Sequence, residues 1–179
     1  MSLRLFAALP IPAEIAARLT PLQTGVPGAR WSPPDNFHIT LRYFGEMEET
    51  AAEDLDAELA CARVKPFEIA LKGAGSFGKD DPHAIWVGVE SHPSLMLLAR
   101  ACDRAARRAG MPAMTRRYTP HVTLAYLRGA EVDPVRRFER RAALFSTPAF
   151  TADRFYLYSS WSREGEPNLY RVEAEYPLG

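Results

Sequence analysis

Two copies of one short phrase carry the residue types that acid–base chemistry needs. The first copy is His38-Ile39-Thr40-Leu41, which opens the run HITLRYFGE, and the second is His121-Val122-Thr123-Leu124, which opens HVTLAYLRG. Each run has the alternation of a β-strand, so its His and Thr lie on one face and its aliphatic residues on the other. We therefore expect each copy to present an imidazole beside a hydroxyl.

A pair of imidazoles suits the hydrolysis of a phosphodiester, especially a strained cyclic one. One neutral His can remove a proton from water while a protonated His gives a proton to the leaving alkoxide. In-line displacement places these two oxygens on opposite sides of phosphorus, so we expect His38 and His121 to be catalytic from opposite walls of a cleft. Thr40 and Thr123 are expected to bind the phosphate by donating hydrogen bonds to its non-bridging oxygens. Such donors replace a metal, so we expect neither a metal nor a cofactor.

A packing role is the alternative for these histidines, because a single His on a strand is more often a hydrogen-bonded core residue. Duplicated packing would explain Ile39 and Val122, but it would not require His and Thr on the opposite face. The matched phrases therefore favour catalysis.

The two phrases belong to a longer repeat in the order of predicted elements. A shift of 83 residues, the separation of His38 and His121, brings strands and helices of the first half onto those of the second. The predicted strands are Leu3–Leu9, His38–Phe44, Phe67–Leu71, Ala84–Val89, His121–Leu127, Phe150–Tyr158 and Leu169–Glu175. Four helices are predicted. The first follows Pro12, and the second runs from the capping box Thr50-Ala51-Ala52-Glu53 to about Arg63. The third runs from Pro93 to Gly110, and the fourth from Asp133 to about Leu144. The pattern predicts two similar lobes that face each other across one cleft.

The composition is that of a folded protein of 179 residues with 47% hydrophobic residues and a formal net charge of zero. No apolar run approaches the ~20 residues needed to span a bilayer, and the first ten residues lack the pattern of a signal peptide. Cys61 and Cys102 fall in predicted helices without CxxC spacing, so we expect two buried, reduced thiols and a cytoplasmic location.

The chain resembles the two-histidine (2H) phosphoesterase superfamily, whose hallmark is a pair of HxTx motifs. More narrowly, it is similar to the RNA 2′,3′-cyclic phosphodiesterases, also called 2′-5′ RNA ligases (LigT-like). The resemblance covers nearly the whole length. It rests on RLFAALPIP, the stretch from Trp31 to Gly45, the stretch from Tyr118 to Ala125, and the stretch from Phe155 to Ser160 with Gly165 and Tyr170.

The resemblance implies an α+β fold with a pseudo-two-fold axis, in which two facing, mostly antiparallel sheets are flanked by helices around the active-site cleft. Residues 1–179 would form a single bilobal 2H phosphoesterase domain. It also implies metal-independent hydrolysis of RNA 2′,3′-cyclic phosphate ends to a 2′-phosphate, with reversible 2′-5′ RNA ligation as an accompanying activity. The expected partners are RNA ends or nucleotides with a 2′,3′-cyclic phosphate. We expect a monomer without an obligate protein partner and without membrane association.

One position departs from the family pattern. Relatives often carry an Arg directly after the second HxTLA, where it contacts phosphate, whereas this chain has Tyr126. Strand parity places Arg42 on the face of His38 and Thr40, so Arg42 is the first candidate for the phosphate-binding charge. Arg116, Arg117 and Arg128 are weaker candidates. Phe77, in the expected glycine-flanked loop GAGSFGK, is a candidate for stacking on a base.

Two other functions compete with this one. The same mechanism could act on small cyclic nucleotides, of the ADP-ribose cyclic phosphate type. A module that binds nucleotides or RNA ends without turnover is the non-enzymatic alternative, and Tyr126 in place of Arg supports it. The intact His and Thr pairs speak against that module, because binding alone does not need two titratable groups.

Overall fold

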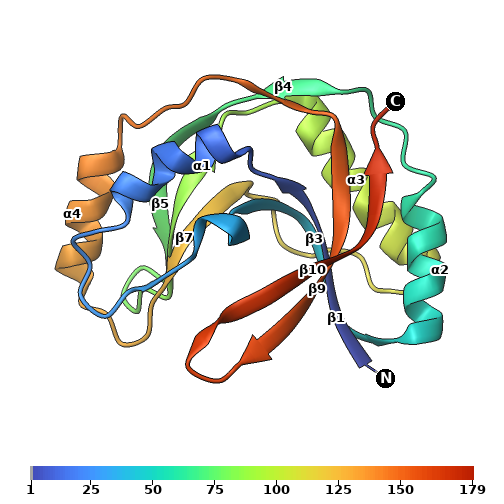
Figure 1. Cartoon of the computed structure of the whole chain (residues 1–179), viewed down its shortest axis with the longest axis horizontal. Helices are drawn as coiled ribbons and strands as arrows, with labels where there is room; N and C mark the ends of the chain where they lie inside the picture. The colour runs from blue at the N-terminus through green and yellow to red at the C-terminus, as the bar shows by residue number, and fades with distance from the viewer. Residues whose placement is uncertain (1) are drawn as a thin grey trace.

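Two four-stranded sheets form the centre of the molecule, and helices cover both ends (Figure 1). The structure is a computed structural model and describes residues 2–179. Sheet A has the strand order β10-β9-β1-β3 and sheet B the order β2-β7-β6-β5. All neighbouring strands within both sheets are antiparallel, which confirms the predicted α+β architecture of two mostly antiparallel sheets flanked by helices.

The observed elements follow the predicted order with shifted ends, but β2 and β5 are additional strands, and the predicted strand Phe150–Tyr158 is divided between β8 and β9. Sheet A comprises β1 (Ser2–Pro10), β3 (His38–Glu48), β9 (Arg154–Arg163) and β10 (Glu166–Pro177). Sheet B comprises β2 (Arg30–Trp31), β5 (Leu71–Phe77), β6 (Ala84–Val89) and β7 (His121–Tyr126). A separate pair is formed by β4 (Phe67–Ile69) and β8 (Phe150–Ala152). The helices are α1 (Ala13–Leu19), α2 (Glu49–Leu59), α3 (Pro93–Arg108) and α4 (Val132–Ala142), with short 3-10 turns at Thr20–Leu22 and Pro34–Asn36.

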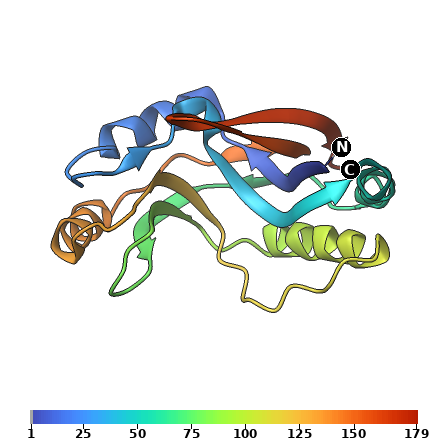
Figure 2. The same cartoon turned by 90° about the horizontal axis from the view of Figure 1, so that it is seen from below.

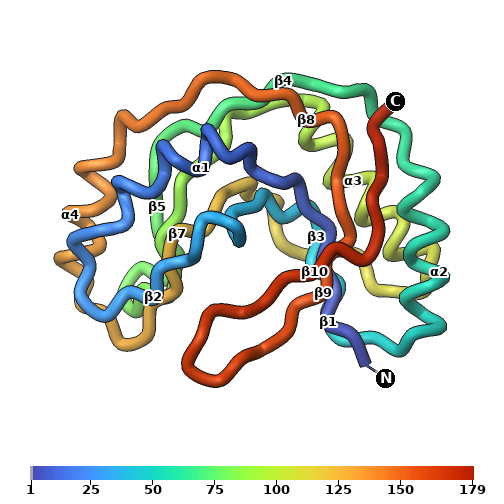
Figure 3. The backbone as a smooth tube through the Cα atoms, viewed as in Figure 1, coloured from blue at the N-terminus to red at the C-terminus, as the bar shows by residue number. Residues whose placement is uncertain are grey.

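The pair β4–β8 marks the pseudo-two-fold axis that the repeat predicts. Glu68 pairs with Thr151 at the middle of this antiparallel ladder, and these two residues are 83 positions apart. A residue that pairs with its own repeat equivalent must lie at the axis. Figure 3 shows the two strands side by side where the chain passes from one lobe to the other.

Strand order establishes which elements correspond between the lobes. In sheet A, β3 pairs with β1 and β1 with β9, and in sheet B, β7 pairs with β6 and β6 with β5. Thus β3, β1 and β9 correspond to β7, β6 and β5, while β10 and β2 are additions at the sheet edges. Sheet A therefore combines strands from both ends of the chain, and Figure 2 shows β1, in blue, in the same sheet as β9 and β10, in red.

Helix α3 follows β6 of sheet B in the chain but packs on the other lobe. It contacts β3 of sheet A and helix α2 (Figure 1). The helix begins where the side chain of His92 accepts a hydrogen bond of 3.1 Å from the backbone N–H of Ser94. Its buried side includes Leu95, Leu98 and Cys102, as the expected apolar helix requires. No helix within residues 2–179 is long and apolar enough to cross a membrane.

Two local predictions on the acidic helix are wrong. Helix α2 begins at Glu49 with Glu48 as its N-cap and without a side-chain capping bond, so Thr50 is already inside the helix and makes no capping box. The helix ends at Leu59, which leaves Cys61 in the following turn with an exposed thiol rather than a buried one. Cys102 is buried as predicted.

The aliphatic residues of both HxTL phrases lie in the core. Ile39 and Leu41 of β3 are 0% and 4% exposed, and Val122 and Leu124 of β7 are both fully buried. His and Thr alternate with them and stay partly exposed on the opposite face. Burial of the aliphatic face thus fixes the register that turns the His–Thr face toward the space between the sheets.

Candidate active site

The two histidines begin equivalent strands that contact each other at the centre of the molecule. His38 is the first residue of β3 and follows the 3-10 turn Pro34–Asn36, whereas His121 is the first residue of β7. The two strands come from different sheets and pack against each other. The hydroxyl of Tyr118, three residues before His121, donates a hydrogen bond of 2.9 Å to the carbonyl of Thr40. This bond ties the segment before β7 to β3.

Both imidazoles are held by the same backbone hydrogen bond. Nδ1 of His38 lies 2.7 Å from the carbonyl oxygen of Asn36, and Nδ1 of His121 lies 2.7 Å from that of Thr119. Asn36 and Thr119 are themselves 83 residues apart, so the repeat includes these contacts. A carbonyl oxygen can only accept, so each Nδ1 carries the proton and each Nε2 is left as the basic atom of the neutral ring.

The hydroxyl of Thr40 stands beside the reactive nitrogen of the first histidine. His38 Nε2 lies 3.1 Å from Thr40 Oγ1, which confirms that the two side chains share a face. Thr123 has the corresponding position on β7, where it pairs in register with Trp86 of β6. Each strand therefore presents an imidazole and a hydroxyl toward the same region.

Burial lowers the basicity of both histidines. Burial lowers the pKa of His38 to about 4; the hydrogen bond to Asn36 opposes this shift, and the nearby charge of His121 adds to it. Burial also lowers the pKa of His121, and its bond to Thr119 again opposes the shift. With the cleft empty, both imidazoles are neutral near neutral pH.

Aromatic side chains form a wall behind each histidine. The ring of His38 lies 4.9 Å from that of Phe6 and 5.4 Å, edge to face, from that of Tyr170. The ring of His121 lies 4.9 Å, edge to face, from that of Phe77 and 5.8 Å from that of Trp86. These contacts restrict ring rotation and keep each Nε2 directed at one place.

Phe77 is the last residue of β5 rather than part of a loop. It touches His121, and its ring also stacks on that of His83 at 6.2 Å. The structure therefore brings Phe77 to the second histidine. Its stacking on a substrate base stays a prediction.

A β-bulge reverses the strand parity after each HxTL phrase. In β3, Thr40 pairs with Ala8 and Arg42 with Ala7, so Leu41 is the extra residue of the bulge. In β7, Thr123 pairs with Trp86 and Ala125 with Ile85, so Leu124 is the extra residue. Because one residue is inserted, the side chain that follows at the second position returns to the opposite face.

The bulge turns Arg42 away from the histidines, so the expectation that it shares their face is wrong. Arg42 is 5% exposed, forms an ion pair with Asp103 of α3, and donates a hydrogen bond of 2.7 Å to the carbonyl of Pro112. Asp103 of α3 neutralises the charge of Arg42. Arg42 therefore anchors β3 to α3 and lies away from the face of His38 and Thr40.

The same bulges bring two tyrosines onto the histidine face. Tyr43 and Tyr126, which are 83 residues apart, are 52% and 49% exposed. Both line the cavity that contains His38 and Thr40. The repeated phrase is therefore longer than HxTL and reads H-x-T-L-x-Y in both copies, a signal that the sequence already contained.

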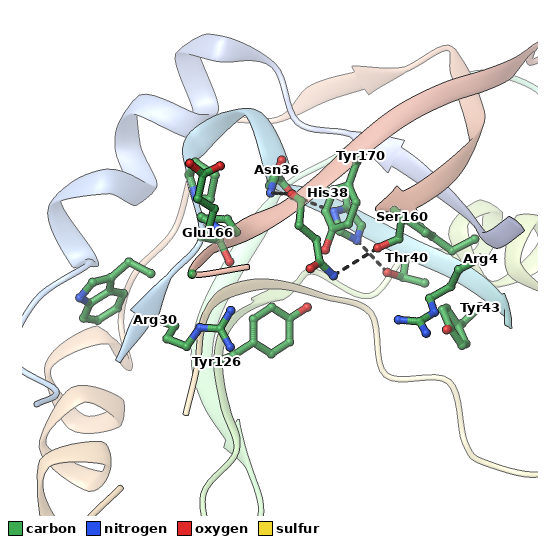
Figure 4. A pocket seen from close by; sticks show the side chains of 17 residues that line it. Arg4, Arg30, Asn36, His38, Thr40, Tyr43, Tyr126, Ser160, Glu166 and Tyr170 are labelled. Atoms are coloured by element: carbon green, nitrogen blue, oxygen red, sulfur yellow. Dashed lines mark hydrogen bonds between the residues drawn. The ribbon is translucent and has the colours of Figure 1, made fainter. Parts of the chain in front are cut away.

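The cavity at this site has a volume of about 630 Å³ and lies between β3, β7, β2 and the β9–β10 hairpin (Figure 4). Its polar lining comprises Arg4, Arg30, Ser32, Asn36, His38, Thr40, Ser160, Glu166 and Asn168. The hairpin wall is fixed to the turn before His38, because the amide of Asn36 donates a hydrogen bond of 2.9 Å to the carbonyl of Asn168. Such a volume is typical of sites for small organic ligands.

Tyr126 of sheet B approaches Tyr170 of sheet A across this cavity, as the close view shows (Figure 4). Burial raises the pKa of Tyr170, and the Tyr126 hydroxyl adds to the shift by its electrostatic and hydrogen-bonding interaction. Tyr126 thus occupies the boundary between the lobes. Arg116, Arg117 and Arg128, the weaker charge candidates, are not among the cavity-lining residues.

Arg30, Asn36 and Tyr118 are site residues that sequence reasoning did not select. Arg30 pairs with Tyr126 across β2 and β7, a register between segments almost a hundred residues apart that no local pattern reveals. Within residues 2–179, no group of three or more His, Cys, Asp or Glu side chains is arranged to hold a metal ion.

Comparison with known sequences identifies one family. The pattern of the 2′-5′ RNA ligase superfamily matches residues 11–163. The RNA 2′,3′-cyclic phosphodiesterase of Aeropyrum pernix is 38% identical over 109 residues, which are 60% of this chain and 61% of that protein. The protein of the same name from Archaeoglobus fulgidus is 30% identical over 112 residues, 60% of this chain and 64% of that protein. The chain thus matches less than two thirds of the length of either relative.

Comparison with solved structures extends over the whole chain. The crystal structure of E. coli LigT complexed with 3′-AMP superposes with a TM-score of 0.81 at 25% identity and covers 99% of both chains. The similarity therefore includes both sheets, the β9–β10 hairpin and the space between them.

Proposed function

Because the chain belongs to the 2′-5′ RNA ligase superfamily, we propose that it hydrolyses the 2′,3′-cyclic phosphate at RNA ends to a 2′-phosphate. The observation that carries the proposal is the matched pair of histidines, each with Nδ1 on a backbone carbonyl and Nε2 as the basic atom of the neutral ring. Relatives with the name RNA 2′,3′-cyclic phosphodiesterase support the reaction and the substrate class. The site draws on both lobes, so we propose that residues 1–179 act as one bilobal catalytic domain.

We assign His38 as the general base and His121 as the general acid. Nε2 of neutral His38 accepts a proton from water as the water oxygen attacks phosphorus, and the bond from phosphorus to the 3′-oxygen breaks. His121 gives its Nε2 proton to that oxygen. His38, with its pKa lowered to about 4 by burial, is the ring that stays neutral more readily. The negative phosphate favours protonation of His121, and solvent exchange then restores both rings.

Thr40 and Thr123 complete the proposed site as hydrogen-bond donors to the non-bridging oxygens. These oxygens gain negative charge as water attacks, so donors placed in advance stabilise the transition state more than the ground state. Thr40 is already beside His38 Nε2 at 3.1 Å. The same residues would serve reverse 2′-5′ joining, with a 5′-hydroxyl leaving or entering in place of water.

A short RNA that ends in a 2′,3′-cyclic phosphate tests the proposal. The full chain should open the ring and yield a terminal 2′-phosphate, which phosphorus NMR distinguishes from a 3′-phosphate. A 3′-phosphate product would reverse the assignment of the leaving oxygen. Failure to open the ring, with an intact fold by circular dichroism, would argue against the proposed reaction.

A small cyclic nucleotide is the second candidate substrate. Its support is the likeness to a structure that holds 3′-AMP and a cavity of about 630 Å³, large enough for one nucleotide. Comparing kcat/KM for a nucleoside 2′,3′-cyclic phosphate with kcat/KM for the short RNA separates the two candidates. We further propose that the protein works as a monomer in the cytoplasm, where the free thiols of Cys61 and Cys102 would stay reduced.

A further inference from the structure

The cavity, which His38 lines and His121 does not, extends well beyond His38. From His38 it continues past Tyr126 to β2 and to the tip of the β9–β10 hairpin, where Arg30, Trp31 and Glu166 line it. Arg30 pairs in register with Tyr126, which lies five residues along β7 from His121. At about 3.3 Å per strand residue, Arg30 is displaced on the order of 15 Å along the sheet from His121. This end of the cavity therefore has room for a group next to the reacting phosphate.

The charges at this end of the cavity leave one cation without a partner. Glu166 is paired with Arg163 at 2.8 Å, and Arg4, at the opposite end, is paired with Glu46 at 2.7 Å. Arg30 is exposed, and its guanidinium makes no ion pair, hydrogen bond or aromatic contact within residues 2–179. Figure 4 shows Arg30 and Tyr126 projecting side by side into the cavity. An unpaired guanidinium at a cavity wall is a ready site for a phosphate group.

We propose that Arg30 binds the phosphodiester that joins the terminal nucleotide of the RNA to the preceding one. The proposal rests on the proposed function, because it takes the cyclic phosphate to lie between His38 and His121. Arg30 then holds the adjoining phosphate at the β2 end of the cavity. The enzyme therefore prefers an RNA end over a mononucleotide, because the mononucleotide carries the same cyclic phosphate but lacks the second phosphate.

The test compares two substrates in wild type and Arg30→Gln. We expect wild type to have a higher kcat/KM for a dinucleotide or longer RNA with a 2′,3′-cyclic phosphate than for a nucleoside 2′,3′-cyclic phosphate. Arg30→Gln should lower kcat/KM for the RNA by about tenfold and leave the mononucleotide value unchanged. Arg30→Lys, which keeps the charge, should restore much of the loss. The salt dependence of kcat/KM for the RNA should become shallower in Arg30→Gln only.

Arg100→Gln serves as the matched control. Arg100 is an exposed arginine of α3 outside the cavity lining, so its loss changes the net charge equally without removing a cavity contact. An equal effect of Arg30→Gln on both substrates, or no effect on the RNA, would overturn the role of Arg30. A wild type that hydrolyses neither substrate would instead refute the proposed function. A similar loss in Arg100→Gln would assign the effect to overall charge and also overturn the subsite.

Discussion

Tyr118 and Thr40 connect the two halves of the site, because the tyrosine hydroxyl donates a hydrogen bond of 2.9 Å to the threonine carbonyl. Burial raises the pKa of Tyr118, so the donor proton is retained throughout the working pH range. The bond fixes the approach of the chain to His121 relative to the strand that carries His38. The bond thus helps to set the distance between His38 and His121.

Removing this hydroxyl should impair turnover more than it impairs stability. We expect Tyr118→Phe to lower the free energy of unfolding by about 1 kcal/mol and kcat by several-fold, since small displacements of acid and base are costly. Steady-state kinetics and urea denaturation measure the two effects. Tyr176→Phe is the control, because it removes a hydroxyl that donates a hydrogen bond of 2.6 Å to Asp56, away from the cavity. An unchanged kcat in Tyr118→Phe would show that the bond is only structural.

Replacing either histidine of the repeated phrase should abolish hydrolysis. Loss of a general acid or base lowers rates on the order of a hundred- to ten-thousand-fold. We therefore expect a rate loss of this size in His38→Gln and in His121→Gln. Activity on an RNA 2′,3′-cyclic phosphate is the measurement. His92→Gln provides the comparison, since His92 caps α3 and should affect stability alone. Near wild-type rates in either cleft variant would be incompatible with two-histidine catalysis.

Acid should destabilise the protein partly through His38. The pKa of His38 is lowered to about 4 in the fold and returns to its ordinary value on unfolding, so the unfolded chain binds the extra proton first. Stability is then complete above about pH 6.5 and declines as the pH falls toward 4, by at most about 3 kcal/mol. Urea denaturation of wild type and His38→Gln across this window measures the difference. Parallel curves for the two proteins would contradict the shift.

Arg42 should matter for stability and not for substrate binding. Arg42→Met leaves Asp103 beside α3 without its cation, which should cost about 3 kcal/mol of unfolding free energy. The KM of the folded variant should stay at the wild-type value, because the side chain points away from the cavity. Kinetics well below the melting temperature, with denaturation in parallel, separate the two effects. A raised KM with unchanged stability would indicate that Arg42 binds the substrate phosphate.

Phe77 should support His121 by contact. Its ring lies 4.9 Å from that of His121, so Phe77→Leu should lower kcat because the imidazole gains rotational freedom. The measurement is kcat and KM on the cyclic phosphate substrate. A rise in KM at unchanged kcat would instead indicate that Phe77 stacks on the base.

The strand faces of both HxTL phrases were predictable from local periodicity, and the repeat from the 83-residue shift, whereas the α+β architecture was an implication of the family resemblance. The sequence did not reveal the bulges at Leu41 and Leu124, where leucine supplies no turn or glycine signal. Strand alternation therefore predicts the face of Thr40 correctly but the face of Arg42 wrongly, because the bulge lies between them. Tyr43 and Tyr126 were open to detection, because the repeat continues to them.

Strand β5 was absent from the prediction because glycines at 73 and 75 indicate a loop. In the fold, the indole of Trp86 lies across residue 75, where a Cβ would come within 2.4 Å of its Cη2 atom. Glycine is thus required by a neighbouring strand that the sequence alone does not place there. Arg30 was missed for the same kind of reason, since its importance depends on pairing with Tyr126.

The strand order of sheet A has a consequence for synthesis on the ribosome. Sheet B needs no residue beyond Tyr126, but β1 stands between β3 and β9, and β9 begins only at Arg154. His38 therefore emerges early in a strand whose sheet remains incomplete until the last part of the chain follows. The hairpin wall of the cavity, from Ser160 to Tyr170, is made later still. A nascent chain that stalls before residue 154 would carry both histidines without a completed sheet A around His38.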